Sequence, residues 1–242
     1  VINTCTVTNM ADRKSRQMLR RVKELNPSAI LVAVGCYVQV YKEELEQIPE
    51  VDLILGTNEK KDIVKFVENI KCVDEKGHSN DIEKMYNDIS NNENNICNST
   101  NEIECKMEHS GNSKEGKQKI SDVMHCEHFV DFGDVTFTEK TRAVIKVQDG
   151  CDRFCSYCII PFARGHIRSR KPESVISEIT KIASNGIKEV VITGIHLASY
   201  GRDFKNDYRL IDLLEDINKV DGIERIRLRF IGTNFNYRRI CK

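Results

Sequence analysis

The sequence predicts an α/β protein in which an N-terminal doubly wound parallel sheet is followed by the first part of a (β/α) barrel. Two observations predict this class. Short, continuously apolar runs, such as AILVAVG at 29–35 and VDLILG at 51–56, are typical of strands that are buried on both faces. Longer segments with helical spacing separate these runs, and strands that alternate with helices form parallel sheets.

The first predicted domain spans residues 1–72. Its first strand is expected at Val1–Thr4 and its first helix at Ala11–Leu25, which ends because a proline follows closely. Because VINTCTV reads as a strand that is already under way, we expect the chain to be a fragment that lacks its beginning. The remaining strands and helices of this domain are expected, in alternating order, at 29–35, near 41–48, at 51–56 and near 60–70.

Residues 73–134 have a different composition. The stretch from Asn80 to Asn101 holds eight asparagines in 22 positions, mixed with other polar residues. Neither a helical nor a strand period persists, which is typical of a polar insert or linker that is mostly disordered. The cysteines of this segment show no spacing that would predict a metal site.

The last predicted domain, residues 135–242, contains three more strands. The strand AVIKVQDG at 143–150 precedes a helix that begins near Pro172 and ends at Gly186. Such a series predicts the opening of a parallel β/α barrel, or an open sheet, that stops too early to close, so the chain is expected to be truncated at this end as well. The other elements are expected as a strand at 188–195, a helix at 208–222 and a strand at 223–232.

Composition limits the class of protein. The 37 basic and 37 acidic residues cancel, so the net charge gives no indication of a polyanionic partner. No secretory signal opens the sequence and no apolar run approaches the length of a membrane span, so we expect a cytoplasmic protein with no membrane partner. In that reducing compartment the ten cysteines are more often metal ligands or catalytic groups than disulfides.

Three cysteines share one loop of the last domain, Cys151, Cys155 and Cys158. The loop leaves the C-terminal end of a strand, where β/α folds place their sites. Three thiolates can hold an iron–sulfur cluster and leave one iron open to a further ligand. Structural zinc takes four protein ligands, usually as paired knuckles, so a triplet favours the cluster. Zinc stays an alternative because HCEH could supply a fourth ligand, and incidental or buried cysteines are another. The candidate fourth ligands are His125, Cys126 and His128.

The spacing C-x3-C-x-aromatic-C after a strand resembles the radical S-adenosylmethionine superfamily. The segments KVQDGCDRFCSYCIIPFARGHIRSR and VVITGIHLASYGRD, with VINTCTVT and AVGCYVQ upstream, resemble the methylthiotransferases that modify tRNA. Among these, TGIHLASYG is most similar to the threonylcarbamoyladenosine tRNA methylthiotransferase branch. The resemblance covers residues 1–72 and about 135–230 and leaves out the insert.

The resemblance implies a partial radical S-adenosylmethionine barrel whose three-cysteine loop holds a [4Fe–4S] cluster. The open iron would bind the amino and carboxylate groups of S-adenosylmethionine, and reductive cleavage would yield a 5′-deoxyadenosyl radical. Tyr157 would lie against the adenine of this cofactor, and Gly194 and His196 near its methionine part. From the residues alone, Gly194 can equally be a turn glycine and His196 a polar loop residue. An electron donor such as flavodoxin or ferredoxin would be needed.

Two further cysteines directly follow the first two predicted strands. Since parallel strands end at the same edge of a sheet, Cys5 and Cys36 are expected to meet there. Free cysteine is also among the most buried residue types, so a core role is the alternative. The resemblance implies a second [4Fe–4S] cluster with three cysteine ligands, of which this chain supplies only these two. We therefore expect the second cluster to load poorly, with Cys72 a weak substitute.

Basic residues gather in two segments. Guanidinium groups bind phosphate in a bidentate way, so the segment beside the cysteine loop is expected to contact tRNA or the cofactor carboxylate. This segment carries Arg164, Arg168 and Arg170. For the first predicted helix a solvated face is an equal alternative. That helix carries Arg13, Lys14, Arg16, Arg20, Arg21 and Lys23.

The resemblance implies methylthiolation of carbon 2 of N6-threonylcarbamoyladenosine at position 37 of tRNA. That carbon–hydrogen bond is unactivated, so a cofactor must carry the step. The alternatives are a radical methylthiotransferase that acts on another tRNA base or on a ribosomal protein, and a non-catalytic, metal-binding fragment. The family pattern is expected to stop near Leu228 and its C-terminal RNA-binding domain is absent from the sequence, so we expect a partial or impaired copy.

Overall fold

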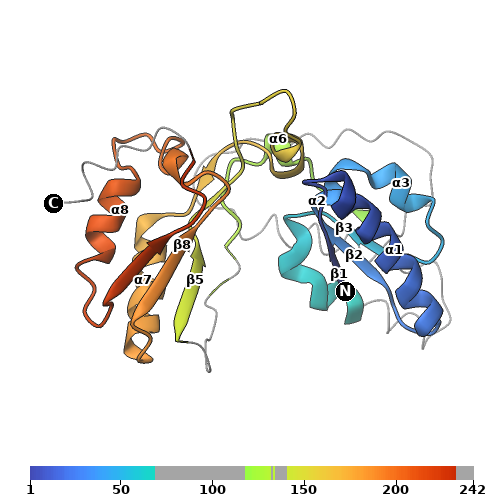
Figure 1. Cartoon of the computed structure of the whole chain (residues 1–242), viewed down its shortest axis with the longest axis horizontal. Helices are drawn as coiled ribbons and strands as arrows, with labels where there is room; N and C mark the ends of the chain where they lie inside the picture. Colours follow the sequence, from blue (N-terminus) through green and yellow to red (C-terminus); the bar gives the residue numbers. More distant parts are fainter. Residues whose placement is uncertain (69–117, 132, 134–140, 233–242) are drawn as a thin grey trace, which may run out of the picture. The chain divides into compact units, whose positions relative to one another are not determined.

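The computed structural model describes residues 1–68, 118–131, 133 and 141–232 (Figure 1). The chain divides into two compact units, Val1–Asp122 and Val123–Lys242. Each unit is built around a parallel sheet with helices packed on it, so the predicted α/β class is confirmed. None of the helices in the described part of the chain combines the length and apolar character needed to cross a bilayer.

The sheet of the first unit has four parallel strands in the order β1-β2-β3-β4. The strands are β1 (Ile2–Thr4), β2 (Val32–Gly35), β3 (Leu53–Leu55) and β4 (Gln118–Lys119). The fourth strand lies in the segment that was predicted as an insert. The boundary between the units, after Asp122, also lies within 73–134, so the described end of that segment belongs to the folded units. Residues 73–117 lie outside the described residues.

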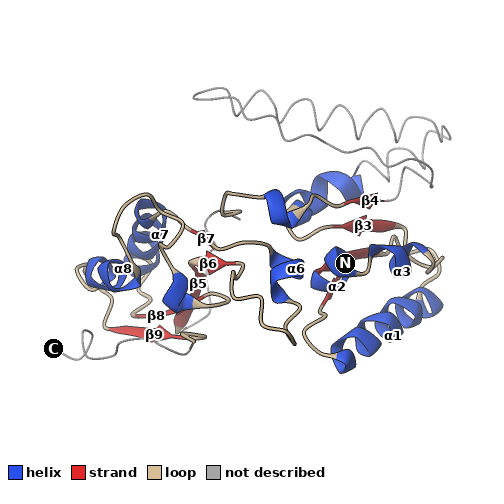
Figure 2. Ribbon diagram, turned by 90° about the horizontal axis from the view of Figure 1, so that it is seen from above, coloured by secondary structure: helices blue, strands red, loops and turns tan. Residues whose placement is uncertain are grey.

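Both faces of this sheet are covered. On one face, α1 (Asn9–Leu25), α2 (Cys36–Val40) and α3 (Lys42–Glu46) surround a core that includes Leu19, Tyr37 and Leu45. On the other, the strand residues pack against Phe66 in the helical stretch 63–68, after η1 (Glu59–Asp62). Figure 2 shows α1 and α3 on one side of the strands and the later helical stretch on the other. The described strand order contains no reversal, so the doubly wound topology stays a prediction.

One predicted helix is replaced by two short ones. The sequence favoured a single helix near 41–48, whereas α2 begins at Cys36, directly after β2, and α3 begins at Lys42. Gly35, with φ of 112°, lets the chain turn from strand to helix without an intervening loop. A Cβ at this position would lie 2.3 Å from the carbonyl oxygen of Thr4, so the approach of β1 also requires glycine.

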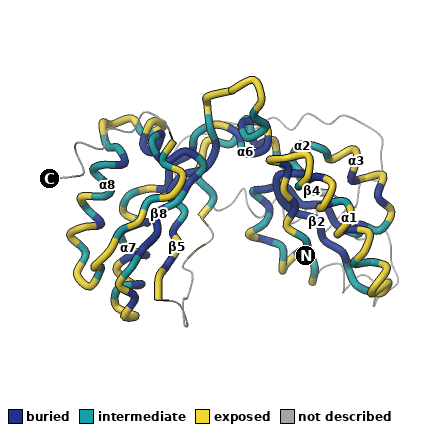
Figure 3. The backbone as a smooth tube through the Cα atoms, viewed as in Figure 1, coloured by how far each residue is buried: buried dark blue, intermediate teal, exposed yellow. Residues whose placement is uncertain are grey.

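The sheet of the second unit has three parallel strands in the order β5-β8-β9. These are β5 (Arg142–Lys146), β8 (Glu189–Thr193) and β9 (Arg225–Leu228). The helices α7 (Pro172–Ser184) and α8 (Leu210–Ile217) cover the same face, where Ile145, Ile192 and Ile179 belong to one core cluster. Figure 3 shows that α7 and α8 carry both buried and exposed residues, and the central strand β8 is the most buried of the three strands. The partial barrel stays a prediction, since three strands do not close one.

Five short elements accompany the three-stranded sheet of the second unit. The strand predicted over 143–150 divides at Val147, because the next two residues pair with a different partner. They form β6 (Gln148–Asp149), which pairs antiparallel with β7 (Arg168–Ser169). The other short elements are η2 (Val123–His125), α6 (Ile160–Arg164) and η3 (Leu197–Ser199).

Candidate functional site

The three-cysteine loop runs from the end of β6 to the start of α6. Its base is fixed where the backbone N–H of Cys151 donates to the carbonyl oxygen of Gly165 over 3.0 Å. Inside the loop the N–H of Cys158 donates to the carbonyl of Cys155 over 2.9 Å. Cys155 is exposed and the other two thiols are partly exposed, and all three are free. The loop therefore presents three accessible thiols from a stem that backbone hydrogen bonds hold in place.

Metal binding by these thiols stays a prediction. Across the described residues, no group of three or more His, Cys, Asp or Glu side chains is arranged to hold a metal ion, and this includes the segment HCEH. The fit of an iron–sulfur cluster therefore rests on the donor set: three soft thiols on one accessible loop match the ligands that such clusters take. The same donors also suit zinc, so the donor set alone leaves both metals open.

Aromatic side chains surround the loop. Tyr157 is 90% exposed, so its ring is free to stack on a planar ligand, as the adenine prediction requires. Phe154 is 44% exposed and packs edge-on against Phe162, with ring centroids 5.9 Å apart. Its other neighbour is His166, whose Nδ1 lies 2.7 Å from a carboxylate oxygen of Asp152.

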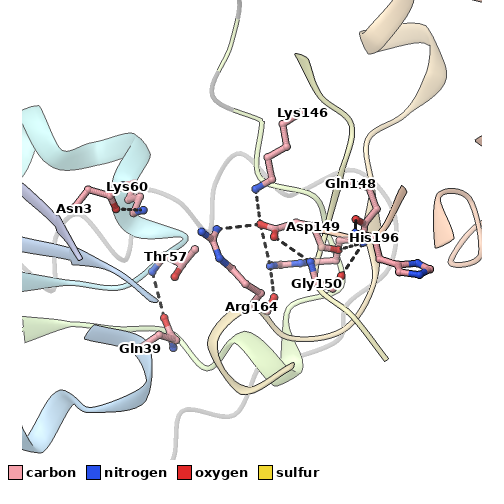
Figure 4. A network of polar contacts seen from close by, with 11 residues as sticks. Asn3, Gln39, Thr57, Lys60, Lys146, Gln148, Asp149, Gly150, Arg164 and His196 are labelled. Carbon is pink, nitrogen blue, oxygen red and sulfur yellow. Dashed lines mark hydrogen bonds and ion pairs between the residues drawn. The ribbon is translucent and has the colours of Figure 1, made fainter. Parts of the chain in front are cut away.

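The stem of the loop is a buried cluster of charges (Figure 4). Asp149 is only 6% exposed, and one of its oxygens lies 2.5 Å from Nζ of Lys146 and 3.5 Å from the guanidinium of Arg164. Its other oxygen accepts from the backbone N–H of Gly150 over 3.0 Å. Burial alone would raise the pKa of Asp149, but the charges of Lys146 and Arg164, with that of Arg168, outweigh it and hold the pKa below its ordinary value. The carboxylate is thus kept ionised in the stem.

A buried amide ties the stem to the strand beside it. Gln148 is fully buried, and its amide nitrogen donates to the carbonyls of Asp149 and Gly150, each over 2.7 Å. Its amide oxygen accepts from the backbone N–H of His196 over 2.8 Å. Sequence reasoning missed Gln148 and Asp149. The signal that could have found them is the pair of polar residues that interrupts an apolar strand immediately before the cysteine motif.

The structure gives Gly194 a packing role. A Cβ on Gly194 would lie 2.8 Å from the amide oxygen of Gln148 and 3.0 Å from its Cβ. The glycine therefore leaves the space that Gln148 occupies. The predicted position near the methionine part of the cofactor remains a prediction, and the packing role holds with or without it.

His196 is buried beside this amide. Its Nδ1 lies 2.7 Å from Oγ of Ser199, and its Nε2 is buried with no hydrogen-bond partner among the described residues. Gly232 packs directly on the ring, since a Cβ there would lie 2.1 Å from Nε2. Burial lowers the pKa of His196, and the charges of Arg153 and Arg202 lower it further. The ring is therefore held neutral in the folded chain.

We expect this neutral ring to make the second unit less stable in acid. The unfolded chain binds a proton at His196 below about pH 6.5, whereas the folded chain resists it. The contribution is therefore present above that pH and is lost as the pH falls through the lowered pKa of the folded chain. Hydrogen exchange of the β8 amides between pH 7.5 and 5 measures this loss as faster local opening. In His196→Gln, the local opening of β8 should depend less on pH. His128→Gln, which changes an exposed histidine, should keep the pH dependence of the unmodified chain. A profile that is unchanged by His196→Gln would contradict the assignment.

The three predicted arginine contacts lie in different surroundings. Arg168 is 2% exposed and its guanidinium lies 3.9 Å from Asp149. Arg170 is 6% exposed and forms ion pairs with Asp131 and Glu178. Their burial argues against direct contact with RNA phosphates and favours roles in holding the fold. Arg164 is partly exposed at 22% of its side chain, so a contact with a ligand stays a proposal for this residue.

In the first unit the strand register brings the other two cysteines to one edge. Thr4 pairs with Gly35, so Cys5 and Cys36 follow neighbouring strands at the same level. This confirms their expected placement, although metal binding by them stays a prediction. Cys36 is buried and begins α2, and Cys5 is exposed, with its backbone bonded to Oγ of Ser15 in both directions over 3.4 Å. Cys72 lies outside the described residues.

Polar atoms without partners also lie at this edge. Thr57 follows β3, and Thr6 follows Cys5, and each is 4% exposed. Neither hydroxyl has a hydrogen-bond partner among the described residues. Buried hydroxyls normally find partners, so these two are compatible with a polar group that binds at the edge. The donor set of two thiols is one short of the three that the resemblance implies.

Comparisons with known proteins agree with this division into two units. Residues 1–56 match the uncharacterized protein family UPF0004, and residues 145–242 match the radical SAM superfamily. The chain is thus a radical S-adenosylmethionine protein with an N-terminal UPF0004 segment. The superfamily match continues to residue 242, so the expectation that the family pattern stops near Leu228 is wrong.

Curated relatives narrow the family. The threonylcarbamoyladenosine tRNA methylthiotransferase MtaB of Bacillus subtilis is 34% identical over 96% of this chain, and that of Aquifex aeolicus is 36% identical over 94%. The ribosomal protein uS12 methylthiotransferase RimO of Desulfitobacterium hafniense is 33% identical over 95%. The chain spans 42%, 45% and 43% of the lengths of these relatives. The chain belongs to the radical S-adenosylmethionine methylthiotransferases and is MtaB-like.

Proposed function

We propose that this chain is part of an enzyme that methylthiolates carbon 2 of N6-threonylcarbamoyladenosine in tRNA. The observation that carries the proposal is the three-thiol loop on its buried stem, in a chain that is 34% and 36% identical to two MtaB proteins. The family uses [4Fe–4S] clusters and S-adenosylmethionine, which together supply a radical strong enough to activate an unreactive carbon–hydrogen bond. The site is expected to act in the cytoplasm with an electron donor such as flavodoxin or ferredoxin.

Each part of the chain has a role in this proposal. Cys151, Cys155 and Cys158 would hold the cluster that binds S-adenosylmethionine, and Tyr157 would present its exposed ring to the adenine. Gln148 and Asp149 keep the base of the loop in place from the buried side. Cys5 and Cys36 would contribute two ligands to a second cluster at the edge of the first sheet. The first sheet would be doubly wound and the second would be the opening of the barrel.

The cluster assignment predicts a large change in metal content. After anaerobic reconstitution, Cys155→Ala should lose about four iron and four sulfide per chain relative to the unmodified chain, together with the visible charge-transfer absorption. Cys126→Ala is the matched control, because that cysteine forms no disulfide and lies outside the loop, so its loss should leave the iron content unchanged. A colourless zinc protein, or equal iron in both variants, would contradict the cluster. About eight iron in the unmodified chain would show that the second site loads fully.

A second candidate function is methylthiolation of a ribosomal protein, since RimO of Desulfitobacterium hafniense is 33% identical to the chain. Nucleoside analysis of tRNA from a strain that lacks the gene separates the two candidates. Loss of the 2-methylthio form of N6-threonylcarbamoyladenosine is the expected result. Unchanged 2-methylthio nucleosides, with loss of the modification on the ribosomal protein, would favour the second candidate.

A further inference from the structure

The helix α1 carries a stripe of arginines on the side opposite to the core. Its apolar contact is made by Leu19, and Asp12 and Ser15 are buried on the same side. At 100° per residue, Gln17 lies about 160° from Leu19, and Arg13 and Arg20 lie about 100° to 120° from it, on the solvent-facing flank. The stripe follows the spacing of i, i+3, i+4, i+7, i+8 and i+11, so its members are neighbours along one face of the helix. Its members are Arg13, Arg16, Gln17, Arg20, Arg21 and Glu24.

These six side chains line a surface hollow of about 520 Å³. All but Arg16 are exposed. The hollow is therefore walled by four guanidinium groups and one amide, with a single carboxylate at one end. We call this surface the arginine hollow.

Most of this positive charge is not neutralised. Within the described residues, Arg13, Arg20 and Arg21 form no ion pair with any carboxylate. Arg16 differs, because its guanidinium donates to the hydroxyl of Tyr37 over 2.9 Å and lies 3.4 Å from Glu44. Three unpaired guanidinium groups on one helix face repel one another, so their clustering has no evident stabilising role in the first unit.

We propose that the arginine hollow binds the phosphate backbone of the RNA substrate. This inference rests on the proposed tRNA function and adds to it a contact surface on the first unit. Guanidinium groups donate two parallel hydrogen bonds to a phosphate, and a row of them on a helix follows a chain of phosphates. The contact is independent of sequence, so it holds and orients the RNA while other groups select the base.

The chemistry of the surface favours RNA over the other anionic partners. A membrane-binding helix would place apolar residues beside the basic ones in a continuous stripe. The exposed apolar residues of α1, Met10, Met18 and Leu25, are instead spaced about two turns apart, and none of them lines the hollow. An acidic peptide would be expected to meet both charge and apolar pockets. The hollow offers only guanidinium groups, one amide and one carboxylate, which suits the repeated phosphates of a nucleic acid.

The test is the affinity of the full chain for a tRNA anticodon stem-loop at several salt concentrations. The variant Arg13→Gln with Arg20→Gln and Arg21→Gln removes three charges and leaves Arg16, with its contacts to Tyr37 and Glu44, in place. We expect the Kd to rise by about tenfold or more, and the slope of log K against log salt to fall by about 2 to 3, because each lost phosphate contact removes about 0.7 to 0.9.

Two matched variants control for charge and for folding. The variant Lys181→Gln with Lys188→Gln and Lys219→Gln removes three charges from the second unit and should leave both Kd and slope unchanged. Replacing the same three arginines by lysine keeps the charge and should restore most of the slope. Circular dichroism of each variant confirms that the helices are intact.

The outcomes separate this inference from the function on which it rests. If the unmodified chain binds the stem-loop and the arginine variant binds it equally well, the arginine hollow is not the contact, while the tRNA function stands. If the unmodified chain binds no RNA but binds a peptide or anionic vesicles through the same arginines, both the inference and the tRNA function are overturned. If the triple Arg→Gln variant and the triple Lys→Gln variant of the second unit lose the same affinity for RNA, the effect is one of general charge. That result would also overturn the inference.

Discussion

Gly150→Ala is expected to destabilise the second unit by about 3 kcal/mol or more. Gly150 has a φ of 72°, which an alanine adopts only with strain. Its added Cβ would also lie 1.8 Å from the carbonyl oxygen of His166 and 2.7 Å from that of Gly165. Both neighbours are backbone atoms, so no side-chain rotation relieves the clash. The strands β6 and β7 must move apart, and with them the base of the cysteine loop.

A matched control separates the clash from the backbone strain. Gly186 has a φ of 82°, but a Cβ there would meet nothing within 4 Å. Gly186→Ala should therefore cost only about 1 kcal/mol. Because the two units can unfold separately, hydrogen exchange of the β5 and β8 amides is the suitable measure. Gly150→Ala should also lower the iron content after reconstitution. If the β5 and β8 amides are equally protected from exchange in Gly150→Ala and Gly186→Ala, the close approach of the backbone to Gly150 has no role in stability.

Asp149→Asn is expected to destabilise the same unit by about 3 to 5 kcal/mol, because it removes a buried carboxylate that, among the described residues, lies between three cations of the stem. Lys146 and Arg164 would lose their ion pairs, and Arg168, which is 2% exposed, would keep a charge that water does not reach. The change is nearly isosteric, so the loss reports on charge and not on packing. The hydrogen exchange of β5 amides measures it.

The control for this charge effect is Glu224→Gln. Glu224 also forms an ion pair, with Nζ of Lys188 at 2.6 Å, but the side chains of Glu224 and Lys188 are 65% and 67% exposed. Exposed pairs are screened by water, so protection should be unchanged. A small effect of Asp149→Asn, comparable to that of the control, would show that water enters the stem.

Topology explains which parts of the candidate site could be predicted. Cys5 and Cys36 were placed at one edge because parallel strands end together, and the register of Thr4 with Gly35 confirms it. The position of the cysteine triplet after a strand was correct for the same reason. These inferences need only the order of strands and helices, which apolar periodicity reveals.

The stem could not be predicted because sequence shows charge but not burial. Arg168 and Arg170 were interpreted as contacts for a ligand, yet they lie at 2% and 6% exposure among carboxylates. Their partners include Asp131, which is 39 positions away from Arg170 and lies in the segment predicted as an insert. Pairings over such distances depend on tertiary packing. The break of the predicted strand at Val147 has the same origin, since the pairing of Asp149 with Arg168 decides it.

The unpaired edge of β9 has a consequence for the solubility of the chain. Among the described strands, β9 pairs only with β8, so its other edge carries backbone groups with no strand partner. Arg225 and Arg227 lie on the same face of β9, and their side chains are 62% and 51% exposed. Both form ion pairs with Glu189 of the neighbouring strand. Charged side chains on an edge strand oppose its pairing with the same edge of a second molecule. These arginines therefore protect the chain from edge-to-edge aggregation during expression and storage.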